Sequence, residues 1–477
     1  MEVKSLYFVL FLPAVVFIYY LFPQRYKWPI LFLSSLFFVA FNSETSLLVL
    51  LSVIIINYTS AQLINKKLNN NIRQYYLWIT ILINLIILGL FKYYNAINRG
   101  SSFVTDLFQI ENPIPHIEWL LPLGISYYIF QAIGYNIEVY RGSEEPETHF
   151  GHFATYLSFF PKLVAGPIEK SNDFLPQLKE KITLKYQNIS DGGRLILWGL
   201  FKKLVIAEHI NEFIQPIFSN PTENSGLPLI LALLFYTVEI YADFSGYTDI
   251  ALGSARLFGI KLSINFMQPF FATSLTDFWR RWHISLSTWV NNYIYTPLSM
   301  WISITFSFKK WGIIFSVFLS FLLLGIWHGS DLTFALFGGI QGLILGYEIL
   351  TIKTRKKLAT KIPNIIYKPI SISLTLFAFA FSCIFFKAKG INEVQLWIVE
   401  MGQLNANFSF LVNLQFLYIV TGIVVFIFVD HYVFQKGFDI WCKTQHVLVR
   451  WSLYLLLIFA IITLSGVNTY PFIYSNF

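Results

Sequence analysis

Charged residues are scarce in this chain of 477 residues, because Asp, Glu, Lys and Arg together make up only 13% of it. A soluble globular protein carries about a quarter of its residues as charges, so this shortage argues against an aqueous environment. Cysteine is also rare: Cys383 lies inside an apolar run and Cys442 in a charged connection. We predict that both are free thiols, which excludes a disulfide scaffold.

Spacings typical of several enzyme and binding classes are missing as well. No pattern resembles a zinc site, a phosphate-binding glycine loop or the turn that carries a nucleophilic serine. The net charge is +8, but the cations do not form the aromatic-interleaved stripe of a nucleic-acid-binding module. We therefore expect no bound metal or cofactor and no nucleic-acid partner. Internal repeats are absent too, so a single domain over residues 1–477 is the simplest expectation.

Apolar residues dominate what is present: 56% of the chain is hydrophobic and 19% is aromatic. Nine uncharged apolar runs occupy residues 7–21, 28–41, 45–64, 75–91, 313–327, 332–347, 370–386, 409–429 and 451–467. Since lipid offers no partner to backbone N–H and C=O groups, these runs must be helices, and the lipid bilayer is the first predicted partner. The first run has no small-residue cleavage site with a basic flank, so we interpret it as a retained helix.

Lysine and arginine gather in every second connection, for example Arg25 with Lys27 and Lys353 with Lys356. Connections rich in these cations face the cytoplasm in membrane proteins. The intervening connections, including residues 42–44, are poor in both. The pattern predicts that both termini lie outside the cytoplasm.

Residues 115–308 differ from the apolar runs, since their apolar stretches are short, interrupted by prolines and mixed with charged side chains. Broken polar segments at membrane depth are tolerated only where protein or water surrounds them. Ionisable groups in such places are costly and usually functional. We expect interfacial or re-entrant helices here, together with the functional site.

The stretch DFWRRWHISLSTW covers residues 277–289 and follows a serine whose spacing is typical of a capping box. It predicts one helix with Arg280, His283 and Ser287 on a shared face. Two interpretations stay open. The helix lies at the headgroups and pairs its arginines with phosphates, or its polar face meets an anionic or polar ligand.

The stretch GIWHGS, residues 325–330, ends an apolar run with a histidine. Imidazoles titrate near physiological pH, so His328 could take a proton from an attacking hydroxyl and return it to a leaving thiolate. Acyl transfer from a thioester needs this chemistry, and the flanking glycines allow close approach of a substrate. The alternative is a structural histidine hydrogen-bonded to a carbonyl.

Two carboxylates, Asp243 and Asp249, lie on either side of Ser245 in YADFSGYTD, residues 241–249. Buried carboxylates need partners. The candidates are Arg256, Arg280 and Arg281. We expect these carboxylates to brace the structure or orient a histidine, with direct acid–base work as the lesser alternative.

Taken together, five stretches resemble the membrane-bound O-acyltransferase family, specifically its bacterial alginate and peptidoglycan O-acetylation branch. They are LPLGISYYIFQAIGYNIEVYRG from Leu121, FFPKLVAGPI from Phe159, YADFSGYTDIALGSARLFGI from Tyr241, DFWRRWHISLSTW from Asp277 and GIWHGS from Gly325. The motif-bearing core thus covers about residues 115–350, and the flanking parts match only as apolar helices.

The resemblance implies an all-α, polytopic helical bundle around a central tunnel. It puts the family's Trp-His-Gly histidine on His328 and its Arg-Arg-Trp-His histidine on His283, both as catalytic residues. Further substrate or tunnel residues are expected at Arg280, Arg281, Trp282, Ser287, Trp327, Asp243, Ser245 and Asp249.

The resemblance also implies an acyl thioester, acetyl-CoA above all, as a cytoplasmic donor substrate of an enzyme in a bacterial cytoplasmic membrane. The acceptor would be a hydroxyl of an extracytoplasmic polysaccharide or of a partner protein. D-alanyl transfer to teichoic acid is the alternative within the enzyme class, and protein acylation is a more distant one. An alternative of another class is a transporter or export component, although paired broken helices typical of transporters are not visible in the sequence.

Overall fold

The computed structural model describes residues 5–66, 69–112, 114–115, 121–306, 309–403, 414–434 and 437–465. Within these residues the chain forms helices and no strand, which confirms the all-α prediction. Eight of the described helices are long and apolar enough to cross a membrane. The protein is therefore a multi-pass membrane protein. The chain divides into two compact units, Met1–Ile196 with Tyr247–Ser263 and Leu197–Gly246 with Ile264–Phe477.

Every predicted apolar run lies on a helix over the part that the structure describes, except for Phe41 and Ser465, which directly follow helix ends; residues 409–413 and 466–467 are outside that part. The expectation of only short, interrupted segments in residues 115–308 is wrong for helix α11, which runs unbroken from Leu227 to Leu257. Pro228 does not interrupt this helix, because a proline in the first turn replaces an N–H that has no helical partner anyway. The charged residues of α11 are tolerated because most of the helix is buried inside protein.

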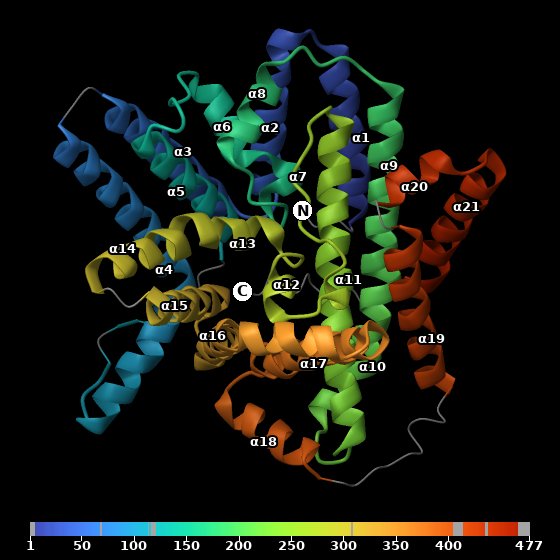
Figure 1. The fold of residues 1–477 in the computed structure, drawn as a ribbon. Coiled ribbons are helices and arrows are strands. Elements are labelled where there is room, and N and C mark those ends of the chain that lie inside the picture. The colour runs from blue at the N-terminus through green and yellow to red at the C-terminus, as the bar shows by residue number, and fades with distance from the viewer. Residues whose placement is uncertain are drawn as a thin grey trace. The chain divides into compact units, whose positions relative to one another are not determined.

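The first unit consists mainly of helices from the N-terminal third of the chain. These are α1 (Leu6–Leu21), η1 (Gln24–Tyr26), α2 (Lys27–Ala40), α3 (Glu44–Asn65), α4 (Asn70–Leu107), α5 (Ile125–Arg141), α6 (Phe150–Ser158), α7 (Phe160–Leu163) and α8 (Ser171–Lys179). Helices α3, α4 and α5 lie side by side (Figure 1). A buried amide network joins them, since Asn84 and Asn136 each bond to Asn57, at 3.0 and 2.9 Å. Such interhelical amide bonds are typical of membrane helix packing.

The second unit carries the remaining helices, and α9 (Tyr186–Phe201) and α11 contribute residues to both units. Its central part contains the π-helical segment η2 (Lys202–Ala207), α10 (Glu208–Ser219), η3 (Pro269–Phe271), α12 (Leu275–Trp279), α13 (Ile284–Val290), η4 (Asn291–Tyr295) and α14 (Thr296–Phe306). Its C-terminal part contains α15 (Lys309–His328), α16 (Leu332–Lys361), α17 (Asn364–Lys387), α18 (Ile391–Met401), α19 (Leu414–Phe428), η6 (Val429–Val433), α20 (Phe438–Thr444) and α21 (Val447–Leu464).

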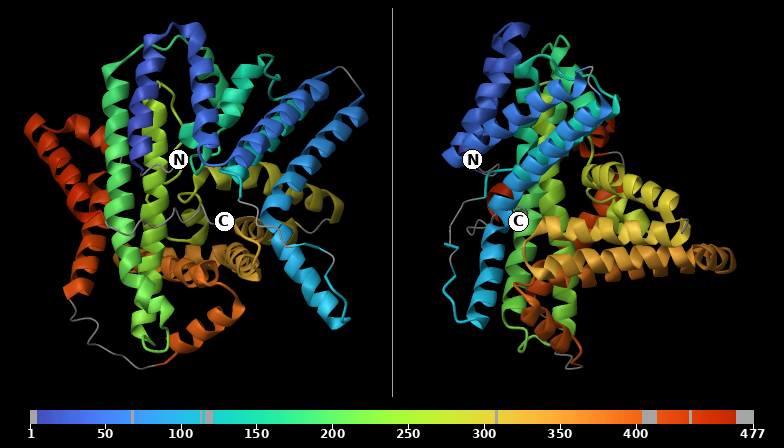
Figure 2. Two further views of the ribbon diagram at one scale, coloured as in Figure 1. Left: turned by 180° about the vertical axis from the view of Figure 1, so that it is seen from behind. Right: turned by 90° about the vertical axis from the view of Figure 1, so that its left-hand side faces the viewer.

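Helices α15 and α16 contact each other along much of their length and run side by side (Figure 2). Gly325 and Gly338 make this possible. A side-chain carbon added at Gly338 would lie 2.8 Å from the α-carbon of Gly325 and would clash with the carbonyl oxygen of Phe321. Small residues at such crossings let two membrane helices approach to backbone contact. The end of α15, which carries His328, is thereby held against the start of α16.

Candidate active site

The DFWRRWH stretch does not form the single helix that its periodicity predicted. Helix α12 ends at Trp279 and α13 begins at Ile284. Between them, His283 has φ 44° and ψ 54°, in the left-handed region that residues other than glycine rarely occupy. Arg280, His283 and Ser287 therefore do not share a helical face, and that prediction is wrong.

An extended segment that packs against this stretch explains the break. The N–H of Met267 donates to the carbonyl oxygen of Arg281, and the N–H of Ile284 donates to the carbonyl oxygen of Asn265, both at 2.9 Å. In a continuous helix, the N–H of Ile284 would instead donate to the carbonyl oxygen four residues before it, and the carbonyl oxygen of Arg281 would accept the N–H four residues after it. Because the bonds go to a second segment, the helix stops and the chain turns at His283.

His283 is fully buried, and its surroundings define which ring nitrogen carries the proton. The Nδ1 atom lies 3.3 Å from Oδ1 of Asn265, which also accepts the backbone N–H of Ser285 at 3.1 Å. Since a backbone N–H can only donate, Oδ1 is an acceptor, and Nδ1 of His283 must be its donor. The ring of Phe244 packs edge-on at 4.7 Å. Burial lowers the pKa of His283 to about 3, so the imidazole is neutral at physiological pH with its lone pair on Nε2.

The residues on either side of Phe244 are held by two consecutive lysines of the π-helical segment η2. Lys203 forms a buried ion pair with Asp243, and Lys202 donates to the hydroxyl of Ser245 at 3.0 Å. Single π-helical turns are frequent at functional sites. Asp243 and Ser245 thus belong to the scaffold that supports Phe244 and, through it, the ring of His283.

The ion-pair partner of Asp243 differs from the arginines that the sequence suggested. Lys203, rather than an arginine, pairs with Asp243, and Arg281 instead pairs with Asp277 at 2.9 Å, four residues earlier. Asp249 lies half-buried on α11, in the part that belongs to the first unit. Two adjacent lysines inside an apolar stretch were the signal in the sequence that could have identified the true partner of Asp243.

His328 is the last residue of α15 and is 3% exposed. Its ring lies among aromatic rings, with centroid distances of 4.8 Å to Trp327, 5.2 Å to Phe386 and 6.1 Å to Phe337. These neighbours come from α15, α16 and α17 and exclude most water. These ring contacts restrict the orientation of the imidazole.

A cavity of about 590 Å³ in the second unit runs along α15. It is lined by Thr276, Trp279, Arg280, Ile284, Ser287, Thr288, Val290, Asn291, Tyr295, Ile313, Val317, Ser320, Phe321, Leu324, Leu345 and Ile349. Two of the predicted substrate residues, Arg280 and Ser287, are among them. From Ile313 to Leu324 the lining follows α15 for roughly 16 Å, and His328 is about one helical turn farther along the same helix.

The other predicted residues do not line this cavity. Trp282 is buried in an aromatic cluster, with its ring 5.2 Å from Phe266, 5.4 Å from Phe278 and 5.3 Å from Phe379. Trp327 packs beside His328. Among the described residues, no three His, Cys, Asp or Glu side chains gather in an arrangement that would hold a metal ion.

Comparison with known proteins gives a consistent result. Residues 144–388 match the profile described as MBOAT, membrane-bound O-acyltransferase family. A probable alginate O-acetylase of Pseudomonas aeruginosa is 34% identical over 350 residues, which cover 72% of this chain and 65% of the relative. A peptidoglycan O-acetyltransferase of Helicobacter pylori is 32% identical over 81% of this chain and 75% of the relative. A teichoic acid D-alanyltransferase of Bacillus subtilis is 27% identical over 55% of this chain and 71% of the relative. The chain thus spans slightly less than two thirds of the length of the Pseudomonas protein.

Proposed function

Because this chain belongs to the membrane-bound O-acyltransferase family, we propose that it transfers an acetyl group from a cytoplasmic thioester to a hydroxyl outside the bacterial cytoplasmic membrane. Membership of this family makes the protein an acyltransferase, so the transporter alternative loses its support. The observation that carries the proposal is the cavity along α15, whose lining runs from Ile313, four residues after the first lysine of the helix, to Leu324, four residues before His328.

The distribution of cations supports an entrance from the cytoplasm. Helix α15 begins with Lys309 and Lys310, and the last turns of α16 carry Lys353, Lys356 and Lys357. Ends rich in lysine face the cytoplasm. One end of the cavity lies toward this side, since Ile313 and Ile349 line it close to these lysines in the sequence, and the lining continues along α15 to Leu324. His328, at the opposite end of α15, would then lie toward the outer face.

Arg280 is the donor-binding residue that we propose. It is exposed and lines the cavity, so its guanidinium is accessible to a ligand. Acetyl-CoA carries several phosphate charges, and arginine binds phosphate with paired, charge-assisted hydrogen bonds. Ser287 offers a second polar contact in the same cavity.

His328 is the general base and acid that we propose. It takes the proton of the acceptor hydroxyl while the hydroxyl oxygen attacks the thioester carbonyl carbon. The C–S bond then breaks, an ester forms, and His328 returns the proton to the leaving thiolate as the free thiol is released. One group at membrane depth can therefore serve both halves of the reaction. His283 is the second catalytic residue that we propose, as a neutral imidazole in the fixed tautomer described above.

Replacing His328 with Ala tests this mechanism. We expect transfer of label from radioactive acetyl-CoA to cell-surface glycan to be lost in membrane vesicles, because no other group would move the proton. The matched control is His446→Asn, since His446 is an exposed helix N-cap and asparagine retains that capping function. Wild-type transfer by a folded His328→Ala protein would remove the mechanism.

D-alanyl transfer is the second candidate function, because the relatives include teichoic acid D-alanyltransferases. The same vesicles, supplied with either radioactive acetyl-CoA or a radioactive D-alanyl thioester, separate the two. Ester-linked acetyl on the glycan, or on a partner protein that passes it to the glycan, supports acetyl transfer. Ester-linked D-alanine supports the alternative.

A further inference from the structure

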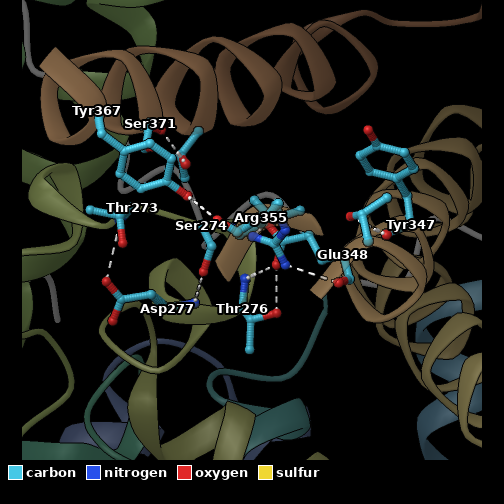
Figure 3. Close-up of polar contacts among 12 residues, drawn as sticks. Thr273, Ser274, Thr276, Asp277, Tyr347, Glu348, Arg355, Tyr367 and Ser371 are labelled. Carbon is cyan, nitrogen blue, oxygen red and sulfur yellow. Dashed lines mark hydrogen bonds and ion pairs between the residues drawn. The ribbon is translucent and has the colours of Figure 1, made fainter. Parts of the chain in front are cut away.

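Glu348 lies on the membrane-spanning helix α16, yet its carboxylate is directed at the start of the short helix α12 (Figure 3). One carboxylate oxygen accepts the backbone N–H of Leu275 at 2.7 Å. The other accepts the backbone N–H of Thr276 at 3.0 Å and its hydroxyl at 2.6 Å. A charged side chain on a membrane helix is costly unless it has partners and a role. Here the carboxylate acts as a capping group supplied by another helix.

Helix α12 depends on such external support. It has five residues, and a helix of that length has no stability of its own in isolation. Its first N–H groups have no partners within the helix. Ser274 accepts the N–H of Asp277 at 3.1 Å, as its spacing predicted, and Glu348 takes the N–H groups of Leu275 and Thr276.

The charge of Glu348 is balanced on its own helix. A guanidinium nitrogen of Arg355 lies 3.7 Å from the carboxylate, and another donates to the carbonyl oxygen of Glu348 at 2.9 Å. The hydroxyl of Tyr367, on α17, donates to the carbonyl oxygen of Arg355 at 3.4 Å (Figure 3). Arg355 therefore joins α16 to α17, and the carboxylate of Glu348, its ion-pair partner, holds α12.

A second attachment fixes the other end of α12. The indole N–H of Trp279 donates to the amide oxygen of Gln341 at 2.9 Å, and the amide nitrogen of Gln341 donates to the hydroxyl of Ser382 at 2.6 Å. Gln341 precedes Glu348 by two turns of α16, so both side chains lie on the same face of that helix. The short helix is thus attached to α16 at its first and last residues.

This attachment shapes one wall of the cavity. Thr276, Trp279 and Arg280 line the cavity from α12 and the residue after it, whereas Leu345 and Ile349 line it from α16. Glu348 does not line the cavity itself, but it binds Thr276 and lies next to Ile349 in the chain. Moving α12 away from α16 would therefore move Arg280 relative to the rest of the cavity.

We propose that Glu348 is a positioning residue for the thioester donor, because it holds α12 on α16 and so directs Arg280 into the cavity. This proposal rests on the proposed function, in which the cavity receives a phosphate-bearing donor. Glu348 contacts neither the donor nor the reacting atoms. Its loss weakens donor binding and leaves the rate of the chemical step largely unchanged.

The test measures binding of radioactive acetyl-CoA to the purified full-length protein in lipid nanodiscs, together with release of free CoA thiol when cell-surface glycan is supplied as the acceptor. Glu348→Ala is expected to raise the Kd for acetyl-CoA by about tenfold, with the turnover at saturating donor within about twofold of wild type. Arg280→Ala raises the Kd similarly. The double variant binds no more weakly than Arg280→Ala alone, because Glu348 acts through Arg280.

Two further variants separate positioning from general instability. Glu348→Gln keeps an acceptor oxygen for α12, so its Kd falls between those of wild type and Glu348→Ala. Thr351→Ala is the matched control, since the hydroxyl of Thr351 bonds only to the carbonyl oxygen of Tyr347 in its own helix at 2.8 Å. It is expected to bind acetyl-CoA as the wild type does.

The possible failures are distinguishable. If wild-type protein neither binds nor cleaves acetyl-CoA, the proposed function fails and the role of Glu348 fails with it. If wild-type protein does both and folded Glu348→Ala protein binds equally well, only the role of Glu348 is overturned. Additive weakening in the double variant would also overturn it, because Glu348 would then act independently of Arg280.

Discussion

Asn265 holds His283 in one tautomer, because its side-chain oxygen lies 3.3 Å from Nδ1 of His283 and is fixed as an acceptor by Ser285. Because this oxygen accepts the backbone N–H of Ser285 at 3.1 Å, it caps the start of α13, and it also accepts the hydroxyl of Ser285 at 2.8 Å. One buried amide thus sets both the proton position on the imidazole and the direction of the chain after it. Groups that orient a functional histidine in this way are often as important as the histidine itself.

Replacing Asn265 with Ala should reduce turnover while leaving donor affinity near the wild-type value. The imidazole of His283 loses the acceptor that fixes its tautomer, and α13 loses a cap worth about 1 kcal/mol. Turnover and Kd for acetyl-CoA, measured on the same preparation in nanodiscs, test this. An unchanged turnover would show that the tautomer of His283 has no part in the reaction.

Replacing Asn265 with Asp should introduce a pH dependence. The added carboxylate favours the imidazolium, so it raises the pKa of His283, which burial lowers to about 3 in the wild type. With a raised pKa, His283 becomes protonated at a higher pH than in the wild type. The variant is expected to lose activity on the acid side of a profile from about pH 5 to 8, where the wild-type imidazole stays neutral. Superimposable profiles would contradict this prediction.

Breaking the buried ion pair of Lys203 and Asp243 should destabilise the protein more than replacing both partners. Lys203→Met leaves an uncompensated buried carboxylate, and such losses cost about 3–5 kcal/mol. Lys203→Met combined with Asp243→Leu removes both charges and should recover much of the loss. Thermal denaturation midpoints in detergent compare the variants, with the exposed Lys389→Met as control. A double variant less stable than Lys203→Met alone would contradict the expectation.

Gly338 and its neighbour Gly339 form a matched pair for testing the α15–α16 contact. A methyl group at Gly338 meets the backbone of Phe321 and Gly325, whereas one at Gly339 comes no closer than 3.9 Å to the ring of Phe318. Gly338→Ala should therefore cost about 1–3 kcal/mol through overpacking. Gly339→Ala should be neutral or stabilising by up to about 1 kcal/mol, because alanine is the better helix former. Thermal denaturation midpoints of the two variants test this prediction. Equal effects of the two substitutions would exclude backbone contact at Gly338.

Glu144 in the first unit should make stability depend on pH. Burial raises its pKa from 4.5 to about 7, against the opposing hydrogen bond from Ser171. Between these two values the folded protein binds more protons than the unfolded chain. The contribution of Glu144 to stability is therefore present below about pH 4.5 and is lost as pH rises toward 7.

Glu144→Gln should flatten this dependence, since the amide does not titrate. Thermal denaturation midpoints between pH 5 and about 8 measure it, with Glu145→Gln as control because Glu145 is exposed. Curves of equal slope for wild type and Glu144→Gln would show that Glu144 does not titrate in this window.

Much of the helical framework could be predicted from local patterns. Each uncharged apolar run forms a helix over its described residues to within one residue of its end, and Cys383 and Cys442 are free as expected. Arg280 and Ser287 line a cavity that extends to within one turn of His328, although the helix on which they were placed does not exist as a single element. The residue types of the motif therefore indicated two residues that share a cavity, whereas periodicity predicted the wrong backbone for them.

The supporting contacts could not be predicted in the same way. Asn265, Lys203 and Glu348 act on elements that lie between 18 and 73 residues away in the chain. Nothing in the local sequence of α12 indicates that a glutamate of α16 caps it. Likewise, the break at His283 depends on backbone bonds to a distant extended segment rather than on a helix-breaking residue.

The sequence by itself determined that this chain is a helical membrane protein and which histidines deserve testing, because lipid forces every long apolar run to satisfy its own backbone hydrogen bonds. Only the tertiary structure decided where those helices stop, which buried charges pair, and how Asn265 and Glu348 hold the short helices of the site. These features depend on which polar groups meet when distant segments pack, and a buried polar group takes whatever partner that packing brings to it.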